Sequence, residues 1–146
     1  MKIFVRAQDL GKKDELTLAK EIKALGFDGL QLAINKAIQG ETAAYGELSE
    51  ERAKEIAKAF LNEGLEIPLI GSYFNPVHSN KELVKKNILK FKMHLEYSHF
   101  FNTLYIGSET GSYNDDKWTY NPLNITEEAY EILKNTFGKL AEYAKK

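Results

Sequence analysis

The chain has 146 residues, of which 43% are hydrophobic and 28% are charged, and it contains no cysteine. This length suits one domain, and the lack of cysteine excludes disulfides and thiolate metal sites, so we expect a reducing, cytoplasmic setting. Twenty basic and twenty-one acidic side chains nearly cancel, which argues against a nucleic-acid partner, and no apolar run reaches the roughly 20 residues of a membrane span.

The first predicted unit is a strand over residues 3–7 followed by a helix over residues 15–25. Apolar side chains recur along the helix at the spacing of one face, and Gly26 is suited to end it in a left-handed conformation. A second strand is expected over residues 29–34, and the loop that follows it reaches residue 48. The amino-terminal part therefore alternates strand and helix.

The second helix is predicted to begin after Ser49, whose hydroxyl can cap the first turn, and to end at Gly64. The third strand covers residues 66–72 and is a nearly continuous apolar run. Such a run is typical of a strand that is covered on both faces. Pro68 lies near its start, where a missing amide donor is tolerated.

The third helix is expected after Ser79, since residues 79–82 have the pattern of a capping box. Its inner face is marked by Val84, Ile88, Phe91 and Leu95. A fourth strand is predicted over residues 103–107, and a last helix begins at Thr126. The expected buried stripe of that helix consists of Tyr130, Leu133, Phe137, Leu140 and Ala144.

The loops that lead from a predicted helix into the next strand are short, whereas most loops that lead from a strand into the next helix are long. Parallel β/α proteins place ligands at the carboxyl ends of their strands, where the long loops would gather. The sequence thus predicts an α/β fold: residues 1–146 form one partial domain of four βα units, with parallel strands in the order 1-2-3-4 and helices outside. A closed (β/α)8 barrel needs about 250 residues, so we expect half of one. The alternative is an open doubly wound sheet with helices on both faces.

Two residues that follow predicted strands are candidates for catalysis. Glu109 lies just past the fourth strand between two glycines, where desolvation can raise a carboxyl pKa and prepare it for proton transfer, hydroxyl binding or metal ligation. His78 follows the third strand and can donate to a sugar oxygen, bind a divalent metal or carry a proton. The structural alternatives are that Glu109 ties down its own loop and that His78 caps the next helix.

Polar and aromatic side chains near the strand ends are candidates for substrate binding: Arg6, Gln31, Tyr73, Asn75 and Trp118. The polar groups fit a hydroxyl-rich ligand, and aromatic faces stack on the apolar face of sugar rings. Asn75-Pro76 is also an ordinary turn signal. No phosphate-binding glycine loop, nucleophile elbow or paired-histidine zinc motif is present, so no motif by itself names a reaction.

Four segments resemble the xylose isomerase-like TIM-barrel proteins, which include sugar phosphate isomerases and epimerases and are related in fold to abasic-site nucleases of the endonuclease IV type. The segments are residues 5–9, 26–32, 71–78 and 107–113, and they cover the amino-terminal half of that fold. The resemblance implies a sugar or sugar phosphate substrate and proton transfer between adjacent carbons through an enediolate. It carries His78 and Glu109 over as residues that line the substrate side.

The resemblance also implies a divalent metal (Mn, Mg, Co or Zn) in the full-length family. Most of its ligands lie on strands five to eight, so we expect no metal to be bound by this half alone, and no independent catalysis. A non-catalytic carbohydrate-binding or oligomeric scaffold is the alternative, and an abasic-site endonuclease is less favoured. The free edges of the first and fourth strands predict a homodimer or a larger oligomer.

Overall fold

The computed structural model describes residues 1–145 and contains one parallel sheet whose strands follow the order β1-β2-β3-β4. The strands are β1 (Phe4–Arg6), β2 (Gly29–Leu32), β3 (Glu66–Gly71) and β4 (Tyr105–Gly107). The α-helices are α1 (Glu15–Ala24), α2 (Ile34–Ala37), α3 (Glu50–Asn62), α4 (Lys81–Tyr97) and α5 (Glu127–Ala144). Three 3-10 helices complete the elements: η1 (Ala7–Leu10), η2 (Ser98–Phe101) and η3 (Pro122–Ile125).

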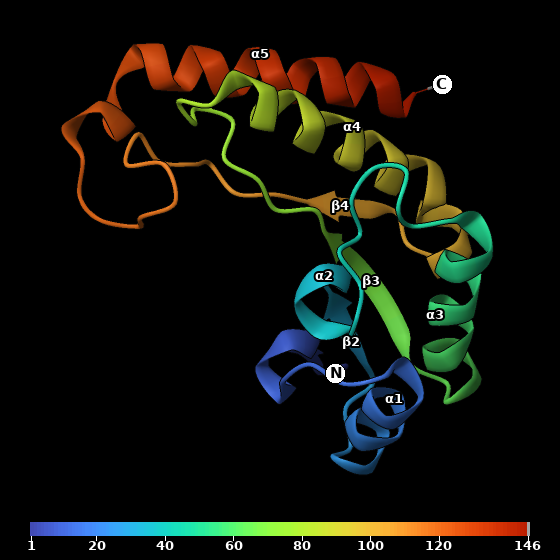
Figure 1. The fold of residues 1–146 in the computed structure, drawn as a ribbon. Helices are drawn as coiled ribbons and strands as arrows, with labels where there is room; N and C mark the ends of the chain where they lie inside the picture. The colour runs from blue at the N-terminus through green and yellow to red at the C-terminus, as the bar shows by residue number, and fades with distance from the viewer. Residues whose placement is uncertain (146) are drawn as a thin grey trace.

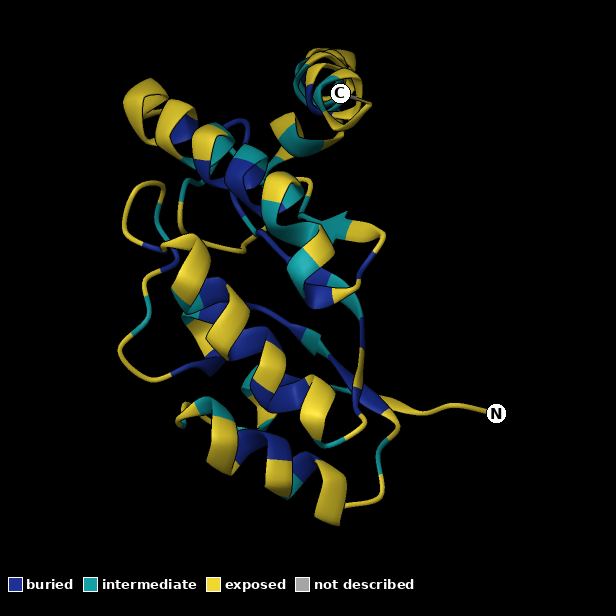
Figure 2. Cartoon of the chain, turned by 90° about the vertical axis from the view of Figure 1, so that its right-hand side faces the viewer, coloured by how far each residue is buried: buried dark blue, intermediate teal, exposed yellow. Residues whose placement is uncertain are grey.

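Helices α1, α3 and α4 form a layer on one face of the sheet, and α5 extends this layer beside α4. Helix α1 packs against α3, α3 packs against η2 at the end of α4, and α4 packs against α5. Figure 1 shows this succession from α1 to α5, and Figure 2 looks onto the helical layer, whose outer surface is largely exposed. The strand order and the one-sided helices confirm half of a TIM barrel and contradict the doubly wound alternative.

The hydrophobic core lies between this helical layer and the sheet. Leu30 and Leu32 of β2 are fully buried in it together with helix residues such as Ile22, Ile56 and Phe60. The intervening strand positions lie on the opposite, inner face of the sheet, where Arg6 pairs in register with Gln31 and Leu69 with Tyr105. Tyr105 is 65% exposed. The inner face, which would be the interior of a closed barrel, is therefore open.

Several predicted boundaries differ from the structure. The second strand ends at Leu32, because Ile34 begins the short helix α2 instead of extending the strand. Ile34 is fully buried, and an apolar β-branched residue fits either element by pattern alone. The predicted cap Ser79 is also wrong: Asn80 is the N-cap of α4, and its Oδ1 accepts from the amide of Leu83 at 3.0 Å.

The prediction that β3 is buried on both faces is wrong. The buried stripe predicted for the last helix is confirmed only in part. Leu69 of β3 is half-buried, because nothing in the described chain covers the inner face. In α5, Leu140 is buried but Tyr130 is 57% exposed, and Ala129 is buried in its place. Helix α5 packs mainly against α4, so only one flank of it is covered. Among residues 1–145, no helix combines the length and the apolar composition needed to cross a membrane.

Candidate functional site

Tyr73, just past β3, folds back over the inner face of the sheet. Its ring lies directly over Gly71, where an added Cβ would stand 2.5 Å from the ring atom Cε2. The hydroxyl of Tyr73 accepts a hydrogen bond from Nε2 of Gln31 on β2. Gly71 thus makes room for an aromatic side chain that joins the carboxyl ends of two neighbouring strands.

Charged side chains surround this tyrosine. Lys36 of α2 places its Nζ 4.6 Å from the centre of the Tyr73 ring and 4.0 Å from Oε1 of Glu109. Arg6 at the end of β1 and Glu109 after β4 both lie close enough to influence the Tyr73 hydroxyl electrostatically. We call Arg6, Gln31, Lys36, Tyr73 and Glu109 the rim cluster.

The rim cluster unites four predicted site residues from all four strand ends, together with one residue that sequence reasoning missed. Lys36 was overlooked because it stands in a polar stretch that was expected to be a loop. The short helix α2 turns this stretch back over the sheet. Its only signal in the sequence was its position after the second strand.

The surroundings of Tyr73 raise the pKa of its phenol above the ordinary value, so the phenol is protonated at neutral pH. Burial raises its pKa, the neighbouring Glu109 carboxylate raises it further, and Arg6 acts in the opposite direction. A neutral phenol that accepts from Gln31 keeps its own proton to donate to a ligand oxygen. Lys90 of α4 anchors the backbone at Tyr73, since its Nζ donates to the Tyr73 carbonyl at 3.1 Å.

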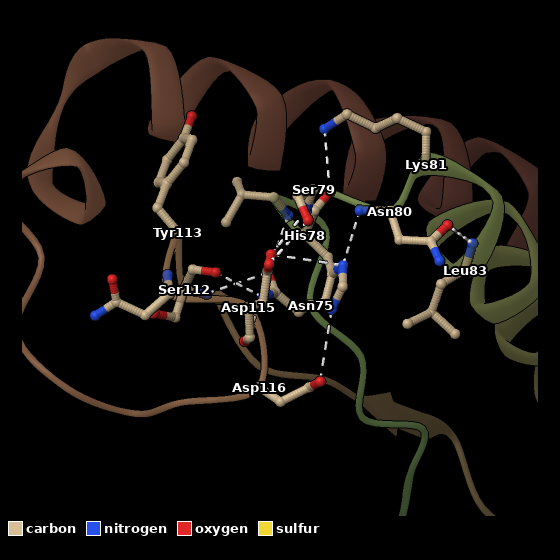
Figure 3. Close-up of polar contacts among 12 residues, drawn as sticks. Asn75, His78, Ser79, Asn80, Lys81, Leu83, Ser112, Tyr113, Asp115 and Asp116 are labelled. Carbon is tan, nitrogen blue, oxygen red and sulfur yellow. Dashed lines mark hydrogen bonds and ion pairs between the residues drawn. The ribbon is translucent and has the colours of Figure 1, made fainter.

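His78 lies in a second group of polar contacts, at the start of α4. Its Nδ1 accepts from the amide of Asn80 at 2.9 Å, and its buried Nε2 lies 3.6 Å from Oδ1 of Asp116 (Figure 3). Asp115 accepts from both the amide and the hydroxyl of Ser79 at 2.8 Å, and these hydrogen bonds lower its pKa. In this structure His78 therefore supports the helix start, and its catalytic role stays a prediction.

Asn75 joins the loop after β3 to the loop after β4. Its Nδ2 donates to the carbonyl groups of Ser112 and Asp115 at 2.6 and 2.9 Å. Its Oδ1 accepts from the amides of Val77 and Ser112 at 3.0 and 3.1 Å. These four bonds use the hydrogen-bonding capacity of the side chain, so the structure places Asn75 in loop support.

The last predicted binding residue, Trp118, is 63% exposed in the loop between β4 and η3. Within residues 1–145, no three His, Asp or Glu side chains are grouped so that they could hold a metal ion. The described residues therefore do not fit the divalent metal of the full-length family.

Replacing Gly71 with alanine is expected to displace the Tyr73 ring and to break its hydrogen bond to Gln31, because the new Cβ overlaps the ring. We expect a loss of about 1 kcal/mol in the free energy of unfolding, measured by urea denaturation. Gly138→Ala in α5 is the matched control: its Cβ meets no atom, so it should stabilise the helix by about 0.5–1 kcal/mol. Equal effects of the two substitutions would contradict the placement of the ring.

Comparisons with known proteins agree with this architecture. The model of the family described as "Xylose isomerase-like TIM barrel" matches residues 19–146. No curated protein sequence matches the chain significantly.

Solved structures show the same fold. A 3-keto-D-glucoside 4-epimerase from E. coli aligns over 99% of this chain and 52% of its own, with a TM-score of 0.69 and 16% identity. A Rhodospirillum rubrum protein classed provisionally as a xylose isomerase gives 99% and 50%, with a TM-score of 0.71 and 21% identity. A D-psicose 3-epimerase in the presence of D-fructose gives 99% and 49%, with a TM-score of 0.67 and 14% identity.

The chain spans about half the length of each of these structures. The family model covers most of the chain, and the strand order and helical layer are those of half a barrel. The chain therefore belongs to the xylose isomerase-like TIM-barrel family.

Proposed function

We propose that this chain supplies one half of a sugar isomerase or epimerase site, with the rim cluster as the part that contacts the sugar. The observation that carries the proposal is the convergence of Gln31, Lys36, Tyr73 and Glu109 at the carboxyl ends of the strands. In β/α barrels the active site lies at this end. Two of the structurally similar proteins are named as sugar epimerases, which supports a sugar as the ligand.

Four members of the rim cluster have roles that follow from their chemistry. The Tyr73 hydroxyl and the Lys36 ammonium donate to sugar oxygens, and Gln31 orients the phenol. Glu109 is partly exposed and is the carboxyl group of the rim cluster, so it is the group that accepts a proton from a carbon next to a carbonyl. After the enediolate has formed, the same carboxyl returns the proton to the adjacent carbon, while the hydroxyl proton passes from one enediolate oxygen to the other.

A cofactor and a partner complete the proposal. The divalent metal of the full-length family is proposed for the complete site only, because residues 1–145 do not group its ligands. Association with further copies through the free edges of β1 and β4 is proposed as the source of a second half.

The test is the exchange of solvent deuterium into D-fructose and other hexoses, followed by NMR in the presence and absence of Mn²⁺. Glu109→Gln is expected to slow exchange by about 100-fold or more while sugar binding changes little, because only proton transfer is removed. Glu63→Gln at the half-buried C-cap of α3, at the opposite end of the sheet from the rim cluster, is the matched control and should behave as the wild type. Exchange that is undiminished in Glu109→Gln would contradict the proposal.

A non-catalytic carbohydrate-binding domain is the second candidate, and the missing metal-ligand group among residues 1–145 favours it. The deuterium-exchange experiment separates this candidate from the enzyme. A binding domain should bind the sugar, but no deuterium should be incorporated at the carbon atoms of the sugar. The abasic-site nuclease is weakened by the net charge of −1 and by the presence of only three histidines in the sequence.

A further inference from the structure

The free edge of β4 lies in an apolar groove beneath α5, which Figure 1 shows passing above this strand together with α4. Two cavities, of about 460 and 250 Å³, adjoin this edge, and Ile106 lines both. We call their apolar lining the strand groove: Phe91, Leu95, Leu104, Ile106, Leu133 and Phe137. Leu104 is 90% exposed, so an apolar side chain is open to solvent beside a strand edge.

The backbone of β4 offers hydrogen bonds to an occupant of this groove. The carbonyl of Gly107 accepts from the amide of Ser72 on the β3 side at 2.8 Å. Successive residues of a strand point their backbone groups alternately to its two sides, so the N–H and C=O of Ile106 point to the unpaired edge. An extended segment satisfies these groups and fills the apolar groove with its side chains.

The strand β1 of a second copy has the properties that this edge requires. Both β1 and β4 are three residues long, and each has a neighbour on one side only. If β1 of each copy pairs with β4 of the other, both junctions are identical under a two-fold axis and no strand edge remains. Eight parallel strands then close a barrel.

Charge at the strand ends favours this pairing. Neighbouring strands in this sheet pair close to their carboxyl ends: Arg6 pairs with Gln31, Leu32 with Ile70, and Gly71 with Gly107. The same register at the new junction sets Arg6 of the second copy opposite Ile106 or Gly107, next to Glu109. Among residues 1–145 Glu109 has one ionic contact, at 4.0 Å to Lys36, so it is available to a second cation. Arg6 donates to both carboxylate oxygens of Asp9 at 2.9 Å in its own chain, so at the new junction it is shared between Asp9 and Glu109.

We propose that two copies of this chain form a closed eight-stranded barrel in which β1 of each copy occupies the strand groove of the other and Arg6 faces Glu109 across each junction. This inference rests on the proposed function, whose site it completes with a second set of rim residues. It differs from general self-association in specifying which strands meet and which charges face each other.

The test exploits the two-fold symmetry. The wild-type chain should show twice the 16.6 kDa of one copy in light scattering at micromolar concentration. Arg6→Glu alone and Glu109→Arg alone each place like charges at both junctions and should weaken the dimer roughly tenfold or more. In an equimolar mixture the new glutamate faces the new arginine at one junction and the other junction keeps the wild-type pair, so a heterodimer should form with near wild-type affinity.

The mixture distinguishes pairing between chains from an interaction within one chain, since each variant keeps its like charges in its own chain. Leu104→Lys should also give a monomer because it charges the strand edge, whereas Leu89→Lys on the outer face of α4 should leave the dimer intact. A wild-type monomer, or a mixture that associates no better than the single variants, would overturn the inference. A wild-type monomer that still binds sugar would overturn the dimer but leave the proposed function standing. A dimer that neither binds sugar nor exchanges deuterium would support the dimer and contradict the proposed function.

Discussion

Replacing Asn75 with aspartate is expected to lower the free energy of unfolding by about 3 kcal/mol. The substitution removes the two N–H donors that bind the carbonyl groups of Ser112 and Asp115. It also turns a negatively charged oxygen toward those two carbonyls, next to the acidic pair Asp115 and Asp116. The loops after β3 and β4 should separate as a result, and urea denaturation followed by circular dichroism measures the loss.

Asn80→Asp is the matched control, because it makes the same chemical change at the N-cap of α4. There only the side-chain oxygen is used, as an acceptor from the amide of Leu83, and aspartate is an equally good cap. Its stability should stay within about 0.5 kcal/mol of the wild type. Hydrogen exchange should show faster opening of the Ser112 and Val77 amides in Asn75→Asp alone. Equal stability of the two variants would show that Asn75 does not hold the loops together.

Replacing His94 with leucine is expected to remove about 2 kcal/mol of acid sensitivity between about pH 7.5 and pH 5. His94 is 1% exposed, and neither ring nitrogen has a hydrogen-bond partner among residues 1–145. Burial, reinforced by the positive charge of Lys90, lowers its pKa from 6.5 to about 4. The folded protein therefore binds this proton more weakly than the unfolded chain does.

The direction of the effect follows from this difference. The contribution of neutral His94 is complete above about pH 6.5 and is lost as the pH falls toward about 4, where the folded state begins to accept the proton. Urea unfolding at both pH values should show a smaller difference for His94→Leu than for the wild type. His99→Leu, at an exposed ring in η2, should keep the wild-type difference. Identical pH dependence of the wild type and His94→Leu would refute the assignment.

Much of the fold could be predicted because it depends on local patterns. The caps Ser49 and Thr126, the stop at Gly26 and the apolar spacing of α4 each record a backbone requirement in a few adjacent residues. The short helix-to-strand loops and the long strand-to-helix loops then predicted a parallel sheet with its functional site at the carboxyl ends of the strands. The predictions failed where burial depends on distant partners, as at Ile34, Leu69 and Tyr130.

The candidate site was predictable only in part, for the same reason. Arg6, Gln31, Tyr73 and Glu109 were predicted from their positions at strand ends, and the structure brings them together with Lys36. His78 and Asn75 follow the same strand as Tyr73, yet their side chains make contacts within the loops. Strand-end position does not specify side-chain direction, which is set by packing between segments far apart in the chain.

The sequence by itself determined the βα alternation, the family and the working edge of the sheet, because these depend on periodicity, caps and turn residues that act over a few positions. Only the tertiary structure decided that Tyr73 lies over Gly71, that Lys36 joins Glu109, and that the edge of β4 lies in an apolar groove. Lys36 and Glu109 are 73 positions apart, and the Tyr73 ring over Gly71 is bound by Gln31, which lies 42 positions away in the sequence. No local pattern records the distance between two such side chains.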